Sequence, residues 1–228
     1  MAKIVYINSA CNQQCIFCLG KHRRTSLVTT KKLPILLKDE RLVISGGETT
    51  LSPDILKMLT LAKKMHINNV ELQTNAMTLA YPGLCRKLLD CGVREFNVNM
   101  PAHFEGLNDS ITLTPGSLKP RLAGLRNLIH LGAKIRLTFV INKLNYATMQ
   151  DYCCFVKNNL PQVNILAFNF VQIEGGALDN TAIVPRLSDI KPHLLRALSY
   201  AAKLQLNLIT ANIPLCILGE KKYFCFRP

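Results

Sequence analysis

The chain has 228 residues, of which 49% are hydrophobic and 18% are charged, and its formal net charge is +14. This composition excludes a disordered or fibrous protein and suits one large globular domain. No apolar stretch reaches the roughly 18 residues of a membrane span, and the apolar run at the start is too short for a signal peptide. We therefore expect a cytoplasmic protein whose nine cysteines are reduced thiols or metal ligands rather than disulfides.

Apolar strand-like runs alternate with segments of helical periodicity along the chain, which predicts a parallel sheet covered by helices. We expect six strands, at residues 4–8, 42–45, 69–74, 95–100, 134–141 and 165–171. Six strand-helix units are too few for the eight of a closed barrel. The sequence therefore predicts an α/β fold of the partial (β/α)6 TIM-like barrel type.

Capping residues and apolar periodicity place helices between these strands. Ser52 followed by Pro53 is typical of a helix start, and Gly92 is typical of a helix end. The expected helices are 52–65, 82–91, one that starts between 117 and 122 and ends at 132, 145–158 capped by Asn145, and a last one capped by Ser188. That last helix should bury one face, made of Ile190, Leu194, Leu198 and Ala201.

Three cysteines directly after the first strand carry the clearest chemical signal. Cys11, Cys15 and Cys18 have C-x3-C-x2-C spacing. A structural zinc site or an ordinary iron-sulfur cluster is closed by four protein ligands, so three thiolates leave a coordination position for a small molecule. Zinc stays an alternative, because His22 follows Cys18 and could complete a Cys3His site.

This spacing, with the aromatic Phe17 before the last cysteine, resembles the radical S-adenosylmethionine (SAM) enzymes. The resemblance implies that Phe17 belongs to the cofactor site. The resemblance implies one [4Fe-4S] cluster held by the three cysteines, with SAM chelating the fourth iron. It further implies that SAM is cleaved to a 5'-deoxyadenosyl radical that abstracts a substrate hydrogen. A flavodoxin- or ferredoxin-like electron donor is the expected partner, and the partial barrel is the fold that the resemblance implies.

A second motif, Gly46-Gly47-Glu48, lies at the end of the second expected strand. Two glycines allow a close backbone approach to a ligand, and a carboxylate can accept hydrogen bonds from an ammonium group. Alone, such a tripeptide is more often just a turn. Together with the cysteines it resembles the family motif that holds the amino group of SAM, which assigns Glu48 to that contact and the two glycines to the same site.

Asparagines end three further strands, at Asn75, Asn99 and Asn142. An amide offers donors and acceptors that suit ribose hydroxyls and the SAM carboxylate. The resemblance implies SAM contacts at these three positions. Asparagine is equally common at strand ends as a turn or cap residue, and that alternative stays open.

Two segments without clear periodicity are expected to form loops at the same end of the barrel. The segment 101–116 is typical of a lid or binding loop, in which His103 is a candidate substrate contact. The glycine-containing segment 172–180 is a second place for substrate contacts.

The remaining cysteines fall into two groups. Four are expected to be buried in helices, namely Cys85, Cys91, Cys153 and Cys154. Cys216 and Cys225 lie where peptide-modifying members of the resembled family often carry ligands of an auxiliary cluster. Two ligands are too few for one, so we predict no auxiliary cluster; a shortened tail or completion by a partner are the alternatives. We take residues 1–205 as the core domain and 206–228 as a short C-terminal extension of the same compact unit.

Lysine and arginine total 28 against 14 acidic residues, and Lys21, Arg23 and Arg24 follow the cysteines closely. This grouping favours an anionic substrate or partner such as a phosphate, RNA or an acidic peptide, although a generally basic surface would explain it too. Our leading interpretation is a radical SAM enzyme that modifies a peptide or protein. An RNA- or nucleotide-modifying radical SAM enzyme is the alternative. A non-catalytic zinc- or cluster-binding interaction protein is the alternative of another class.

Overall fold

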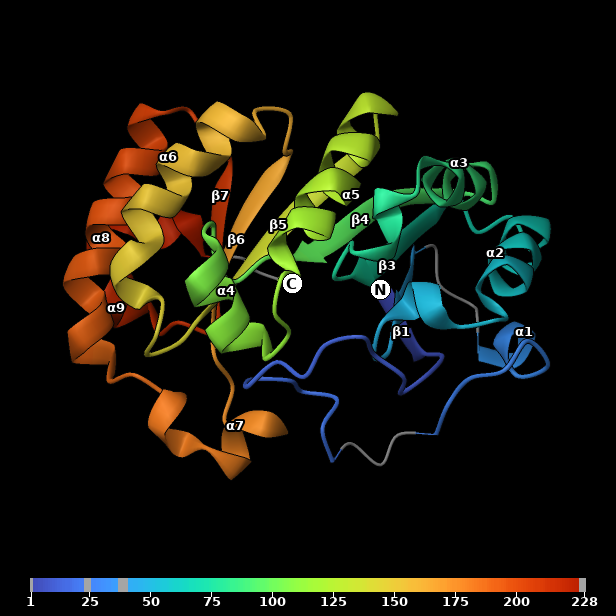
Figure 1. The fold of residues 1–228 in the computed structure, drawn as a ribbon, viewed down its shortest axis with the longest axis horizontal. Helices are drawn as coiled ribbons and strands as arrows, with labels where there is room; N and C mark the ends of the chain where they lie inside the picture. Colours follow the sequence, from blue (N-terminus) through green and yellow to red (C-terminus); the bar gives the residue numbers. More distant parts are fainter. Residues whose placement is uncertain (1, 23–25, 37–40, 226–228) are drawn as a thin grey trace. The chain divides into compact units, whose positions relative to one another are not determined.

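The computed structural model describes residues 2–22, 26–36 and 41–225 and contains an α/β fold with seven strands in the sheet order β1-β2-β3-β4-β5-β6-β7 (Figure 1). The strands are β1 (Ala2–Tyr6), β2 (Arg41–Ser45), β3 (Asn69–Thr74), β4 (Val93–Asn99), β5 (Lys134–Ile141), β6 (Ile165–Phe170) and β7 (Leu208–Ala211). The strand pairs β1-β2, β2-β3, β3-β4, β5-β6 and β6-β7 are all parallel. The predicted α/β class is confirmed, whereas the expected number of strands was one too low.

Nine α-helices are found within the described ranges. They are α1 (Leu33–Leu36), α2 (Ile55–Lys64), α3 (Pro82–Asp90), α4 (Glu105–Thr112), α5 (Leu118–His130), α6 (Met149–Asn159), α7 (Gly176–Asp179), α8 (Leu187–Lys203) and α9 (Leu215–Leu218). Short 3-10 turns precede or follow several of them, for example Thr49–Leu51 before α2 and Tyr146–Thr148 before α6.

Three predicted helix starts were wrong. Asn145, expected to cap the helix 145–158, precedes the 3-10 turn Tyr146–Thr148, and α6 begins at Met149. The backbone N–H of Ser52 donates to Thr49 and closes the 3-10 turn, so α2 begins three residues later at Ile55. In α8 the N-cap is Arg186, which places Ser188 inside the first turn. The predicted end of α3 is confirmed, because Gly92 has a φ of 105° directly after the C-cap residue.

The segment 101–116, expected to be an unstructured loop, contains helix α4. The segment 172–180 likewise contains the short helix α7. Helix α4 has few apolar residues, yet Asn108, Ile111 and Thr112 are buried together on one side of it. Because two of these buried positions are polar, the apolar residues alone do not show the helical periodicity of α4.

The chain divides into two compact units, each described by itself. The first takes the described residues of 1–13, 23–99 and 119–135, and the second those of 14–22, 100–118 and 136–228. The first therefore holds β1 to β4 with α1, α2, α3 and α5, and the second holds most of β5 with β6, β7 and the remaining helices. No helix in the described ranges is long and apolar enough to cross a membrane.

The core of the second unit follows the expected pattern of α8. Ile190, Leu194, Leu198 and Ala201 are fully buried on one face, as predicted, and α8 packs against α6. Tyr152 of α6 packs against aromatic side chains of the sheet. The rings of Phe139 and Tyr152 are 4.6 Å apart, and those of Phe139 and Phe168 are 5.3 Å apart. Such edge-to-face contacts add to the stability that burial of the rings supplies.

Two cysteines are structural thiols, as the sequence predicts. Burial raises the pKa of Cys85 to about 11 and that of Cys153 to about 12, so both thiols stay protonated at neutral pH. Cys91 and Cys154 are only partly buried. A protonated, inaccessible thiol is a poor nucleophile and a poor metal ligand, which leaves Cys85 and Cys153 to packing.

The ring of His103 packs among aromatic side chains. Its ring contacts the aromatic rings of Phe104, Tyr152 and Phe155, with centroids 5.1 to 5.9 Å away. Burial lowers the pKa of His103, and the negative charge of Asp151 offsets part of that effect. These rings favour the neutral imidazole, whose buried Nδ1 has no hydrogen-bond partner among the described residues, and the substrate contact expected of His103 stays a prediction.

Candidate functional site

The three motif cysteines are thiols with some solvent exposure. Cys11 is exposed and belongs to the first unit, while Cys15 and Cys18 are partly exposed and belong to the second. Within the described ranges no group of three or more Cys, His, Asp or Glu side chains converges in a metal-binding arrangement. Three accessible thiols suit the soft metals of iron-sulfur chemistry, and their joint role as ligands stays a prediction.

Backbone and side-chain N–H groups surround the first thiol. The N–H of Gln13 approaches the Sγ of Cys11 at 3.4 Å, and the amide Nδ2 of Asn75 lies 3.9 Å from the same sulfur. Hydrogen bonds to cluster sulfurs are one of the features that set the reduction potential of iron-sulfur centres. Asn75 also donates to Asn12 Oδ1 at 2.7 Å, which fixes the orientation of its amide.

The segment that carries Cys15 and Cys18 is anchored in the second unit. Gln14 and Ile16 donate backbone hydrogen bonds to the carbonyls of Thr112 and Ile111, at 3.1 and 3.0 Å. Phe17 is buried in a cluster of apolar side chains, made of Ile111, Val171, Ala177 and Ile183. The structure therefore uses Phe17, predicted as a cofactor-site residue, to hold the cysteine segment in place.

His22, the fourth ligand of the zinc alternative, is engaged elsewhere. Its Nε2 lies 2.9 Å from a carboxylate oxygen of Asp179, and the ammonium of Lys21 lies 2.8 Å from the same oxygen. These two contacts lower the pKa of Asp179, with the hydrogen bond from Lys21 contributing most. Arg23 and Arg24, which the sequence grouped with Lys21, lie outside the described residues.

The Gly-Gly-Glu motif packs directly on the residues that lead to Cys11. Gly47 and Glu48 donate backbone hydrogen bonds to the carbonyls of Asn8 and Ala10, at 3.0 and 2.7 Å, and Asn8 Nδ2 donates back to the Glu48 carbonyl at 2.7 Å. A Cβ at Gly46 would lie 2.4 Å from Asn8 Oδ1, and one at Gly47 would lie 2.2 Å from the Ala10 carbonyl. The close approach that these glycines permit is therefore an approach to the chain's own backbone.

The Glu48 side chain is fully buried and heavily hydrogen-bonded. Its Oε1 accepts from the N–H and the hydroxyl of Thr50 and from the hydroxyl of Thr74, at 3.1, 2.6 and 2.7 Å. Its Oε2 accepts from the N–H of Asn75 at 2.6 Å. A carboxylate offers about four lone-pair sites, so acceptor capacity is left mainly on Oε2.

A buried arginine, which the sequence did not single out, links this region to the cysteine segment. Arg121 of α5 is fully buried; its Nε donates to the Asn75 carbonyl at 3.1 Å and its Nη2 to Gln13 Oε1 at 2.9 Å. The sequence does contain a pattern that predicts burial of Arg121. Arg121 precedes the buried Leu125 and Leu128 by four and seven residues, which places all three on one face of the helix. An arginine on the apolar face of a helix needs buried acceptors.

The other two predicted asparagines differ from each other. The Oδ1 of Asn99 is buried and has no hydrogen-bond partner among the described residues. Asn142 is fully buried, and its amide is engaged locally, accepting from the Leu144 N–H and donating to the Val140 carbonyl at 3.0 Å each. The local bonds of Asn142 are those of a turn residue, whereas Asn99 offers an unused acceptor.

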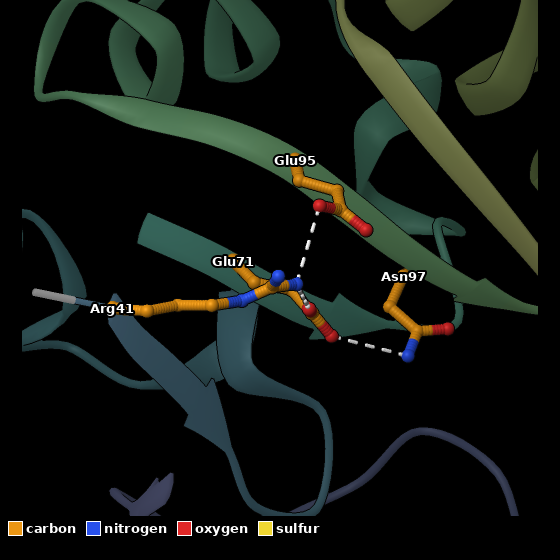
Figure 2. A network of polar contacts seen from close by, with 4 residues as sticks. All are labelled: Arg41, Glu71, Glu95 and Asn97. Atoms are coloured by element: carbon orange, nitrogen blue, oxygen red, sulfur yellow. Dashed lines mark hydrogen bonds and ion pairs between the residues drawn. The ribbon is translucent and has the colours of Figure 1, made fainter. Parts of the chain in front are cut away.

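One face of β2 to β4 is polar, as Figure 2 shows for its central part. Glu71 and Glu95 are directly opposite in the β3-β4 register, and Nη2 of Arg41 contacts both carboxylates. Asn97 Nδ2 donates to Glu71 Oε1 at 3.2 Å. A guanidinium shared between two carboxylates offsets the repulsion that two like charges on neighbouring strands would otherwise create.

The same polar face continues to the carboxyl ends of these strands. There the Ser45 hydroxyl donates to Gln73 Oε1 at 2.7 Å, and Asn99 follows Asn97 on the same side of β4. The opposite face is apolar, with Leu42, Ile44, Leu72, Phe96 and Val98 fully buried. Ligands of parallel α/β sheets bind at the carboxyl ends of the strands, so this polar face leads toward the expected position of a ligand.

The sequence matches a known protein family and is similar to several curated proteins. The sequence profile of the Radical SAM superfamily matches residues 5–155. A probable GTP 3',8-cyclase of Sulfurisphaera tokodaii is 26% identical over 160 residues, which cover 66% of this chain and 50% of that protein. Mycofactocin maturase MftC of Mycobacterium tuberculosis is 28% identical over 152 residues, which cover 63% of this chain and 38% of that protein.

Solved structures show the same fold at low sequence identity. SuiB of Streptococcus suis bound to S-adenosylmethionine has a TM-score of 0.73 at 18% identity, covering 92% of this chain and 50% of SuiB. The protein anSMEcpe with bound AdoMet and the Kp18Cys peptide has a TM-score of 0.67 at 14% identity, covering 92% of this chain and 63% of that one. The chain thus spans half or less of the length of the curated relatives named above.

Proposed function

The chain belongs to the radical SAM superfamily, and from that premise we propose that Cys11, Cys15 and Cys18 bind one [4Fe-4S] cluster and that SAM binds beside it. The superfamily implies a cluster and SAM, and homologues named as enzymes support catalysis. When bound, the two groups supply a 5'-deoxyadenosyl radical for hydrogen abstraction. The reductant that fits this role is a flavodoxin- or ferredoxin-like protein.

The observation that carries this proposal is the direct attachment of the Gly-Gly-Glu motif to the segment before Cys11. Two short backbone hydrogen bonds, from Gly47 to Asn8 and from Glu48 to Ala10, join the two motifs in the first unit. Any side chain at Gly46 or Gly47 would break this attachment. A ligand held by one motif would therefore lie next to a metal held by the other.

The chain's own residues then orient SAM. We assign Glu48 Oε2 to the amino group, since that oxygen accepts a single protein donor. Asn99 offers a buried, unused Oδ1 for a hydroxyl or ammonium donor. Asn75 and Asn142 are assigned as further SAM contacts, although the amide of each already makes the hydrogen bonds described above.

Iron analysis tests the proposal directly. Protein reconstituted without oxygen should be brown and hold about four irons per chain, and alanine at Cys11, Cys15 or Cys18 should abolish this. Cys91→Ala is the matched control, because Cys91 is also partly exposed and lies at the end of a helix. Reduced wild type should form 5'-deoxyadenosine from SAM. A colourless protein that holds zinc would contradict the assignment.

Two substrate classes follow from the relatives, and we rank peptide modification first. MftC is named as a maturase, and SuiB is solved with its precursor peptide SuiA. The second class is a nucleotide or RNA, favoured by relatives named GTP 3',8-cyclases and by the formal charge of +14.

Turnover separates the two classes. Formation of 5'-deoxyadenosine should rise when the correct substrate is added, so we compare GTP, RNA and a peptide encoded by a neighbouring gene. Stimulation by GTP, or RNA retention that weakens as salt rises, would favour the second class. Stimulation by the peptide alone would favour the first.

A further inference from the structure

The start of α7, at Gly175 and Gly176, contacts the backbone of the segment that carries Cys15 and Cys18. Gly176 donates its backbone N–H to the Cys18 carbonyl at 2.9 Å. A Cβ at Gly176 would lie 2.6 Å from the Ile16 carbonyl oxygen and 3.1 Å from the Cys18 nitrogen. Only glycine allows this approach, because a real Cβ does not come so near to backbone atoms.

Gly175 imposes a stricter requirement at the same place. Its φ of 54° and ψ of −122° lie in a region that L-residues with side chains avoid. A Cβ there would lie 2.3 Å from the Cys18 carbonyl oxygen and 3.0 Å from the Cα of Leu19. Both the backbone conformation and the space around it therefore demand glycine.

Charge and apolar packing hold the two segments together on either side of this contact. Asp179, at the end of α7, pairs with Lys21 and His22 just beyond the last cysteine. Val171 and Ala177 pack against Phe17, between the two cysteines. The residues 171–179 thus contact the cysteine segment at three places, and we call them the cysteine clamp.

We propose that the cysteine clamp positions Cys15 and Cys18 for metal binding, with Gly175 and Gly176 as positioning residues. The proposal rests on the proposed function, because it takes these cysteines as cluster ligands. Ligand geometry depends on the residues that hold the ligands, so a displaced Cys18 backbone weakens the hold on the metal without removing any ligand. The glycines of the segment 172–180 therefore serve the cluster rather than a substrate.

A matched pair of substitutions isolates the contact from backbone strain. Gly219 has almost the same conformation as Gly175, with φ 55° and ψ −127°, but a Cβ there would meet no atom within 4 Å. Gly175→Ala and Gly219→Ala should therefore carry a similar conformational cost. Only the first pushes against the cysteine segment.

The first measurement uses protein without metal. The rates at which iodoacetamide alkylates Cys15 and Cys18, resolved by mass spectrometry, should rise in Gly175→Ala and stay at the wild-type value in Gly219→Ala. Asp179→Asn is a milder second variant at an exposed site, and should also raise the Cys18 rate. It keeps the test decisive if Gly175→Ala does not fold.

The second measurement uses the reconstituted protein. We expect Gly175→Ala to lose iron to a chelator about 10–100-fold faster than wild type, the range for residues that support metal ligands. Its reduced cluster should also show an altered EPR spectrum, which a purely structural role would not change. Gly219→Ala should match wild type in both.

The outcomes separate the two proposals. A wild type without iron would refute the proposed function, while the alkylation rates would still decide whether the clamp orders the thiols. The clamp proposal alone would be overturned by a different result. In that case wild type holds four irons, and both Gly175→Ala and Asp179→Asn have the wild-type alkylation rates, rate of iron loss and EPR spectrum.

Discussion

Replacing Glu48 by glutamine should destabilise the fold by a calculable amount. The carboxylate is fully buried and accepts four hydrogen bonds, three on Oε1 and one on Oε2. A glutamine has one acceptor oxygen and one amide nitrogen. In its better orientation the nitrogen replaces Oε2, so that only the Asn75 N–H loses its acceptor.

The loss of one hydrogen bond to a charged group costs about 1.5–3 kcal/mol. For a chain of this length each 1 kcal/mol lowers Tm by about 2–4 °C, so the expected decrease for Glu48→Gln is about 3–12 °C. Alanine would leave all four donors without an acceptor. At about 1–3 kcal/mol each, that cost is comparable to the whole stability of a typical domain, so alanine would report on folding rather than on SAM.

The assay is thermal unfolding of protein without metal, followed by circular dichroism, with Glu220→Gln as the control for an exposed carboxylate. SAM affinity is then measured well below Tm, where the variant is folded. A Tm within about 1 °C of both wild type and control would refute the hydrogen-bond reasoning, since a change at a neutral surface site is that small. Weaker SAM binding with an unchanged Tm would leave Glu48 as a ligand contact alone.

Three further changes have clear expected outcomes. Arg121→Met removes at least the two hydrogen bonds described above from a buried guanidinium and should cost about 3 kcal/mol or more in urea unfolding; a loss below about 1 kcal/mol would contradict its role. Because burial lowers the pKa of His103 despite Asp151, the unfolded chain binds a proton more readily, so stability should fall as pH drops from about 7 to 5. His103→Gln should flatten that dependence, and equal slopes would argue against it. Alanine at Cys216 or Cys225 should leave the iron count at about four, whereas about eight irons in wild type would reveal an auxiliary cluster.

Most of the sheet could be predicted from the sequence. Its strands either alternate apolar and polar residues or are continuous apolar runs bounded by polar residues. The bounds of β3 and β5 agree with the prediction residue for residue, and those of β2 and β6 to within one residue. β7 has only four residues, too few to show a period. Its place is fixed by parallel pairing with β6, which is a tertiary contact.

Helix starts were harder to predict, because a serine before an apolar run is only a local preference. Ser52 and Ser188 both had this appearance, yet α2 begins three residues after Ser52 and α8 begins one residue before Ser188. Pro82 and Gly92 gave better results for α3, since proline and glycine restrict the backbone itself.

In the candidate site, the residues with reactive or polar side chains could be predicted from the sequence, whereas the tertiary contacts that hold them could not. The sequence predicted that the cysteines, Glu48 and the asparagines would matter, because their side chains carry the donors and acceptors that a metal and SAM need. It could not show that Gly175 and Gly176 contact the Cys18 backbone, because that contact joins residues far apart in the chain, as the His22 and Asp179 pair does across 157 positions.

The hydrogen bond from Arg121 to Gln13 can form only late in the synthesis of the chain. Its two residues are 108 positions apart, so the segment after Cys11 gains this partner only when α5 has been made. At a synthesis rate of about 5–20 residues per second, the delay is roughly 5–20 s. Chains truncated before α5 should therefore be cut by protease near Gln13, while longer ones resist. For that interval the segment around Gln13 lacks one of its anchors, next to a cysteine that stays exposed in the folded chain as well.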